Sequence, residues 1–152
     1  LVCYNLKKLK GGFMSDQDIR NALAENLMNS GVDQSKIDWE ESSFNPLGLD
    51  YYVDFNVFDS TEIGAGKTLT DTAEQNGFLQ IRVYRAMNSN DRGILMRSVI
   101  DMVKAAFLSG SETSYNGQVV AILDSNGINP TDSESWRQGG LTINYRAFKE
   151  RV

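Results

Sequence analysis

Two segments, 52–58 and 78–84, alternate apolar and polar residues, and this alternation limits the possible fold more than any other feature of the chain. The apolar positions are Val53, Phe55, Val57, Leu79, Ile81 and Val83. A period of two places all of them on one side of an extended chain, as in a strand with one buried face. The two segments therefore predict strands of a sheet that packs one face on the core.

Two further segments have the period of amphipathic helices. The first begins at Ser15, a good N-cap residue, and ends at Gly31. The second is predicted over 91–108, with a cap at Ser89 or Asn90. Their apolar positions are Ile19, Ala22, Leu23 and Leu27 in the first helix, and Leu95, Val99, Met102, Val103 and Ala106 in the second. Both stripes are expected to face the core.

Weaker signals complete the expected fold. Short strands are predicted at 37–39, 118–123 and 141–147, and the Asn-Gly and Asn-Pro turn signals predict a loop over 124–135. The polar segment 59–76 is long for a connection and predicts a loop or hairpin that projects from the domain. The order of helix, strands, helix and strands predicts an α+β fold, a mostly antiparallel sheet with both helices packed on one face.

Residues 1–13 have two interpretations. The stretch 10–13 back-translates readily to a purine-rich ribosome-binding sequence just before the codon of Met14, which suggests a native start at Met14. Alternatively, the segment is a basic arm that reaches a neighbouring subunit. Either way, residues 14–152 are expected to form one domain.

Charge is sorted into blocks along the chain. Residues 31–76 hold ten acidic and two basic side chains, whereas the basic residues of 77–110 are Arg82, Arg85, Arg92, Arg97 and Lys104, against two acids. A subunit with separate acidic and basic faces can bind copies of itself head to tail, and such contacts make rings when the rotation closes. Because the net charge is −5, tight binding to DNA is not expected.

The side chains that most often perform catalysis are scarce. The chain has no histidine, and its one cysteine, Cys3, cannot form a disulfide within the chain. Zinc and calcium sites need ligand spacings that the sequence lacks. No apolar run approaches the roughly 18 residues of a membrane span. We therefore expect a protein that is not an enzyme, with no cofactor, no metal and no membrane partner.

One motif suggests a different class of function. Residues 64–68, Gly-Ala-Gly-Lys-Thr, resemble the end of a phosphate-binding loop. Thr61 stands where that loop requires its first glycine, and no strong helix pattern follows. A small nucleotide- or ligand-binding module built on this segment remains an alternative.

Taken in order, several pieces of the chain resemble the tail-terminator, or tail-completion, proteins of long-tailed bacteriophages. The most characteristic is 77–84, a glycine followed by a strand with a central Gln80 and a final Tyr84. The other matching pieces are 18–23, 39–40, 44–46, 52–55, 90–93 with Phe107, and 141–148. Each piece is weak alone, and their order and spacing carry the resemblance over most of the chain.

The resemblance implies a structural virion subunit without a reaction. Such a subunit forms a ring, usually a hexamer, at the head-proximal end of the tail, where it ends tail-tube polymerisation and joins the tail to the head connector. The implied partners are copies of itself, the tail-tube protein and the head-tail connector protein, with DNA passing through the lumen without specific binding. It would be made in the host bacterial cytoplasm. A head-completion or neck connector subunit is the nearest alternative.

Charged side chains of the two blocks are the expected interface residues: Glu62, Lys67, Asp71, Arg82, Arg85 and Arg92. Lys67 and its loop are expected to reach an adjacent ring or subunit. Among the aromatic residues, Trp39 is expected in the core, while Phe44 and Trp136 remain open between core and interface.

Overall fold

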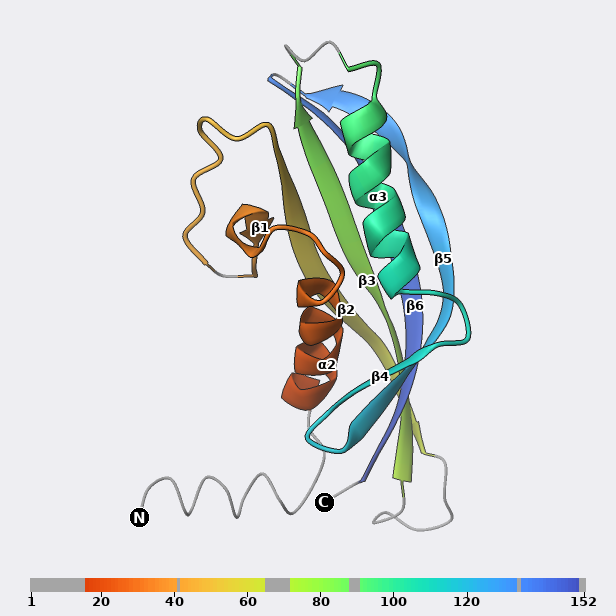
Figure 1. The fold of residues 1–152 in the computed structure, drawn as a ribbon. Helices are drawn as coiled ribbons and strands as arrows, with labels where there is room; N and C mark the ends of the chain where they lie inside the picture. Colours follow the sequence, from red (N-terminus) through yellow and green to blue (C-terminus); the bar gives the residue numbers. More distant parts are fainter. Residues whose placement is uncertain (1–15, 41, 65–71, 88–90, 134, 151–152) are drawn as a thin grey trace, which may run out of the picture.

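The computed structural model describes residues 16–40, 42–64, 72–87, 91–133 and 135–150, which form two helices and one curled sheet (Figure 1). The elements are α2 (Asp16–Met28), a 3₁₀ turn η1 (Gln34–Lys36), β1 (Ile37–Asp38), β2 (Tyr51–Gly64), β3 (Thr72–Ala86), α3 (Ile94–Ala106), β4 (Glu112–Tyr115), β5 (Gln118–Ser133) and β6 (Trp136–Glu150). The six described strands lie in the order β1-β2-β3-β6-β5-β4. Only the β1–β2 pair is parallel among those strands, so the predicted α+β fold with a mostly antiparallel sheet is confirmed.

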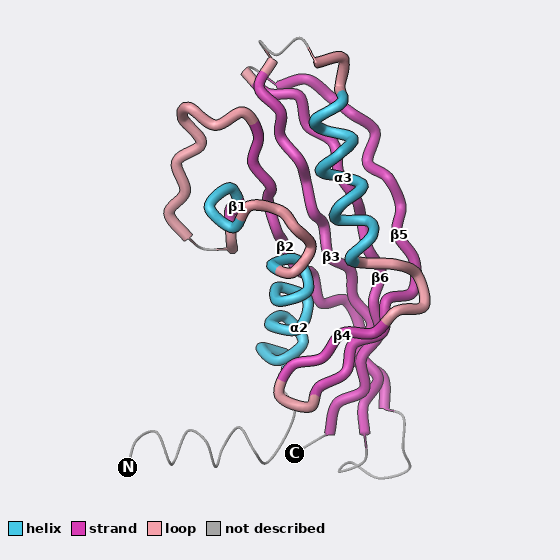
Figure 2. The backbone as a smooth tube through the Cα atoms, in the orientation of Figure 1, coloured by secondary structure: helices cyan, strands magenta, loops and turns pink. Residues whose placement is uncertain are grey.

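Both helices pack on the same face of the sheet, as predicted (Figure 2). Helix α2 lies over β4 and β5, and α3 lies over β3 and β6. The alternation of 52–58 and 78–84 places Phe55 and Ile81 on this inner face, where both are fully buried and Ile81 lies opposite Leu141 of β6. A hydrogen bond joins the helix layer to the sheet, since Thr113 Oγ1 in β4 donates to the carbonyl oxygen of Ala22 in α2. Another joins the two helices, since Asn26 Nδ2 donates to the carbonyl oxygen of Ala106.

The predicted projecting hairpin is present. Strands β2 and β3 stay paired beyond the helices as far as Gly64 and Ala73, with an irregularity between Asp59 and Thr61. Strand β6 pairs with the whole length of β3 up to Thr72 and Glu150. The projection is therefore a three-stranded extension of the sheet rather than a free loop (Figure 1). We call the β2–β3 part, residues 59–74, the arm.

The predicted loop over 124–135 is wrong. Most of this segment is the second half of β5, which pairs with β6 from Asp124 to Ser133. Beyond the short β4 this half forms an edge of the sheet, where both faces are largely exposed and no apolar alternation is required. The irregularity between Ile128 and Thr131 accommodates Pro130, because proline is tolerated at edges and bulges.

Helix α3 begins at Ile94, three residues later than predicted. Gly93, which has a positive φ of 79°, occupies the N-cap position without a side-chain cap. Asp91 takes over the capping role, since its carboxylate accepts from the backbone N–H groups of Gly93 (3.0 Å) and Leu95 (3.2 Å). The predicted caps Ser15, Ser89 and Asn90 lie outside the described residues.

Candidate interaction surfaces

Among the six residues predicted for an interface, those that the structure describes do not gather in one place. Glu62 belongs to the paired arm, opposite Gln75. Its side chain, like the whole of Lys67 and Asp71, lies outside what the structure describes. The three arginines are described and do not converge: Arg82 lies on the outer face of β3, Arg85 near its end, and Arg92 in the turn before α3.

Arg85 is engaged within its own protomer. Its Nε and Nη2 atoms donate to Asp91 Oδ2 at 3.1 and 3.0 Å, and its Nη1 atom donates to the carbonyl oxygen of Asp50 at 2.9 Å. Partial burial acts to raise the pKa of Asp91, but these bonds and those from the backbone outweigh it, so this pKa lies below its usual range. The pair joins β3 to the start of α3.

Arg82 faces outward across the hairpin from Asp54. Burial raises the pKa of Asp54, and a hydrogen bond from Asn56 and the charge of Arg82 only partly oppose this rise. Burial also raises the pKa of the neighbouring Asp38, with a further contribution from the charge of Asp54. The acidic and basic blocks thus meet within one protomer at this point.

Aromatic side chains gather on the outer face near the same end of the sheet. Tyr52 stacks on Tyr84 with ring centroids 4.5 Å apart, meets the edge of Trp136 at 5.0 Å, and contacts Phe44 at 5.4 Å. Burial, followed by the neighbouring Tyr84, raises the pKa of Tyr52 to about 12. Trp136 and Phe44 therefore pack on the face opposite the helices. Trp39 packs against the core beside Phe55, as expected (5.2 Å).

Glu40 has a structural role at the free edge of β2. Strand β1 pairs with β2 only as far as Asp54, so the next residues of β2 lack a partner strand on that side. The Glu40 carboxylate accepts from the backbone N–H of Val57 at 3.1 Å and from Arg20 Nε at 3.3 Å. Arg20 in turn lies 5.6 Å from the ring centre of Trp39. The Glu40 carboxylate thus accepts from a backbone N–H of β2 beyond the end of the β1 pairing.

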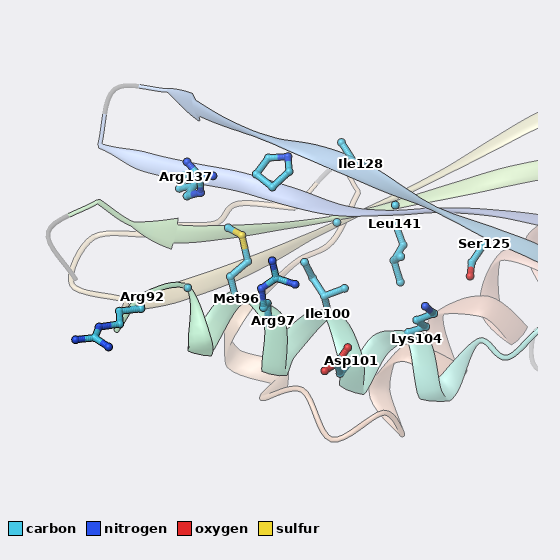
Figure 3. Close-up of a pocket in the computed structure, with 14 residues that line it drawn as sticks. Arg92, Met96, Arg97, Ile100, Asp101, Lys104, Ser125, Ile128, Arg137 and Leu141 are labelled. Atoms are coloured by element: carbon cyan, nitrogen blue, oxygen red, sulfur yellow. The ribbon is translucent and has the colours of Figure 1, made fainter. Parts of the chain in front are cut away.

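A cleft of about 640 Å³ lies between α3 and the outer parts of β5 and β6 (Figure 3). Its apolar residues are Met96, Ile100, Ile128, Pro130 and Leu141. Arg92, which adopts a positive φ of 58°, lies at the end of the cleft near the start of α3. In Figure 3, Ile100 and Leu141 extend toward each other from the helix and the sheet.

The charged side chains around this cleft are mainly cationic. They are Arg92, Arg97, Lys104, Arg137 and Asp101, four cations against one carboxylate. Arg137 pairs with Asp132 at 2.9 Å, whereas Arg97 and Lys104 are exposed and form no ion pair with any residue that the structure describes. The cleft therefore offers an apolar floor with a cationic rim, which we call the basic cleft.

Sequence reasoning placed Arg97 and Lys104 in the basic block but did not place them in a cleft. The opposite wall of the cleft belongs to β5, in the segment that was predicted to be a loop. The spacing of Arg97, Ile100 and Lys104, three and four residues apart, does indicate one helix face that carries both charged and apolar side chains.

The described residues include neither a cluster that could hold a metal ion nor a helix that could span a membrane. No group of three or more cysteine, aspartate or glutamate side chains there is arranged to hold a metal ion. Neither helix of the described ranges is long and apolar enough to span a membrane. The segment 64–68, which resembles a phosphate-binding loop, lies outside the description except for the end of β2 at Gly64.

Comparisons with known proteins give fold similarity only. No family model and no curated protein matches the sequence. One similar solved structure is a protein whose name states no function: TM-score 0.71, 18% identity, 88% of this chain and 96% of that chain covered. Another is a chain from the virion of a native gene transfer agent particle: TM-score 0.55, 16% identity, with the same coverage. At these identities the likeness concerns the fold.

Proposed function

We propose that this chain is a structural virion subunit that forms a ring at the head-proximal end of a phage-like tail. The resemblance to tail-terminator proteins implies a ring of six copies. The ring ends polymerisation of the tail tube and joins the tail to the head connector. The observation that carries this proposal is the fold shared with a chain of a gene transfer agent virion over 88% of the present chain. The order of motif pieces from 18 to 148 supports the same role.

The physical requirements of this role agree with the surfaces described. A terminator must recognise neighbours on several sides, and this protomer presents an outer sheet face, a basic cleft beside α3, and an arm that extends beyond the helices. The proposed role requires no chemical reaction. DNA would pass the ring without specific binding, because the chain is acidic overall.

Deletion of the gene in the virus or prophage that encodes the chain tests the proposal. Electron microscopy of the lysate should show tail tubes of unregulated length and filled heads without tails, and a plasmid copy of the gene should restore normal particles. Tails of normal length beside unattached heads would instead indicate a neck subunit. Infectious particles with normal tails would contradict both roles.

A further inference from the structure

We propose that the basic cleft of one protomer receives the arm of the next, so that copies join head to tail. This inference deepens the proposed function. It rests on that function because a ring requires copies of the chain to bind one another. It commits to a second copy of this chain as the occupant of the cleft.

Charge complementarity is the first argument. The exposed cations Arg97 and Lys104 lie on the α3 side of the basic cleft, within a set of four cations and one carboxylate. The arm carries four carboxylates and one lysine, and one of those carboxylates, Glu74, pairs with Arg146 of the same protomer at 3.3 Å. Opposite charges of this kind orient an encounter and fix its register.

Apolar complementarity is the second argument. The floor of the basic cleft is formed by side chains such as Ile100 and Leu141. The acidic arm also contains two large apolar residues, Ile63 and Leu69. An acidic segment with one or two apolar anchors has the composition that an apolar floor with a cationic rim would bind.

Geometry excludes docking of the arm into the cleft of its own protomer. Strand β3 runs away from the arm, and its residues Ile81 and Arg85 pair with the cleft residues Leu141 and Arg137. These positions lie 9 and 13 residues beyond Thr72, or roughly 30 and 43 Å at about 3.3 Å per residue. The seven residues between Gly64 and Thr72 reach only about 13 Å before they must return.

The contact is therefore heterologous, since each protomer contributes an arm on one side and a cleft on the other. Helix α3, which lines the basic cleft, lies toward the end of the sheet opposite to the arm (Figure 1). A heterologous contact repeats from copy to copy and yields a ring when its rotation closes. The third notable surface, the outer aromatic face, remains free in this arrangement.

Charge reversal on each side tests the inference with the full chain. The cleft variant is Arg97→Glu with Lys104→Glu, and the arm variant is Glu62→Lys with Asp71→Lys. Sedimentation velocity at low salt should show self-association of the wild type, and about a tenfold or greater loss of affinity for each variant. The variant with all four reversals should regain association. A control with Glu25→Lys and Glu112→Lys has the same charge change as the arm variant and should associate like the wild type.

A mixture of two neutralised variants distinguishes this contact from any symmetric one. Arg97→Ala with Lys104→Ala disables the cleft in the first variant, and Glu62→Ala with Asp71→Ala disables the arm in the second. The first keeps an intact arm and the second an intact cleft, whereas their altered surfaces carry no complementary charges, so together they should form one contact and stop at a dimer. Wild-type behaviour of either variant, closed rings in the mixture, or a monomeric wild type at every soluble concentration would overturn the inference. If rings on tails persist both in the cleft variant alone and in the arm variant alone, the inference fails while the proposed function stands.

Discussion

The two faces of the sheet differ although the same strands build both. On the inner face, Phe55, Ile81 and Ile143 are fully buried under the helices. On the outer face, Phe58 keeps 43% of its surface exposed, and polar or charged residues such as Arg82 separate the aromatic pairs. The helices thus determine which face of the sheet stabilises the protomer. Core packing does not constrain the side chains of the uncovered face, so these can instead suit contacts with other molecules.

The largest expected effect comes from disrupting the backbone that both faces share. Gly140 pairs with Arg82 and has a φ of 142°, and a Cβ atom there would collide with the carbonyl oxygen of Ile81 and lie 2.8 Å from the Cα of Arg82. Gly140→Ala should lower the free energy of unfolding by about 3 kcal/mol or more, because the backbone atoms of Ile81 and Arg82 cannot move away without breaking the β3–β6 pairing.

Gly127→Ala is the matched control for this substitution. It lies on the neighbouring strand β5, and a Cβ atom there meets nothing within 4 Å. Urea denaturation should show a change within about 0.5 kcal/mol for this variant. Equal stability of the two alanine variants would show that the β3–β6 pairing relaxes freely at Gly140.

A second pair of variants compares the faces directly on one strand. Phe55→Ala removes a fully buried ring from the inner face and should cost about 3–5 kcal/mol. Phe58→Ala removes an outer ring that stacks on Phe78 at 4.8 Å, and it should cost about 1 kcal/mol. Thermal and urea denaturation of both variants check this order; similar losses would mean that the outer face contributes to stability as much as the core.

The sequence predicted the inner face well because burial imposes a period on it. The positions of Val53, Leu79 and Ile81 follow from alternation alone, and both helices were found from their apolar stripes. Met96 was missed, because the stripe predicted for α3 began at Leu95, yet Met96 is the buried residue of the two.

The parts that the sequence did not predict are those where no core imposes a pattern. The outer half of β5 is exposed on both sides, so its turn-forming residues indicated a loop although the backbone pairs with β6. The basic cleft depends on that half of β5 and was therefore not predicted. The role of Glu40 as an acceptor for a backbone N–H of β2 depends on β1 being only two residues long, which periodicity does not reveal.

The smallest expected effect is on the pH dependence of stability, and it has opposite signs for two carboxylates whose pKa values are shifted in opposite directions. The pKa of Asp54, on the outer face, is raised by burial, so between its unfolded and folded pKa values the folded state binds more protons. Its contribution to stability is therefore present at low pH and lost as pH rises through the folded pKa. Asp54→Asn should leave the protein slightly more stable at pH 7 and remove this part of the pH dependence.

Asp91 provides the comparison of opposite sign. Despite partial burial its pKa is lowered, by Arg85 and by backbone N–H donors, so its contribution is present above the unfolded pKa and lost as pH falls through the folded pKa. Asp91→Asn should lower stability at pH 7 and lessen the loss of stability on acidification. Denaturation curves between pH 3 and pH 7, a range of about four units around the reference carboxyl pKa values, check both signs. Destabilisation by Asp54→Asn at pH 7 would mean that its attraction to Arg82 outweighs the cost of burying its charge.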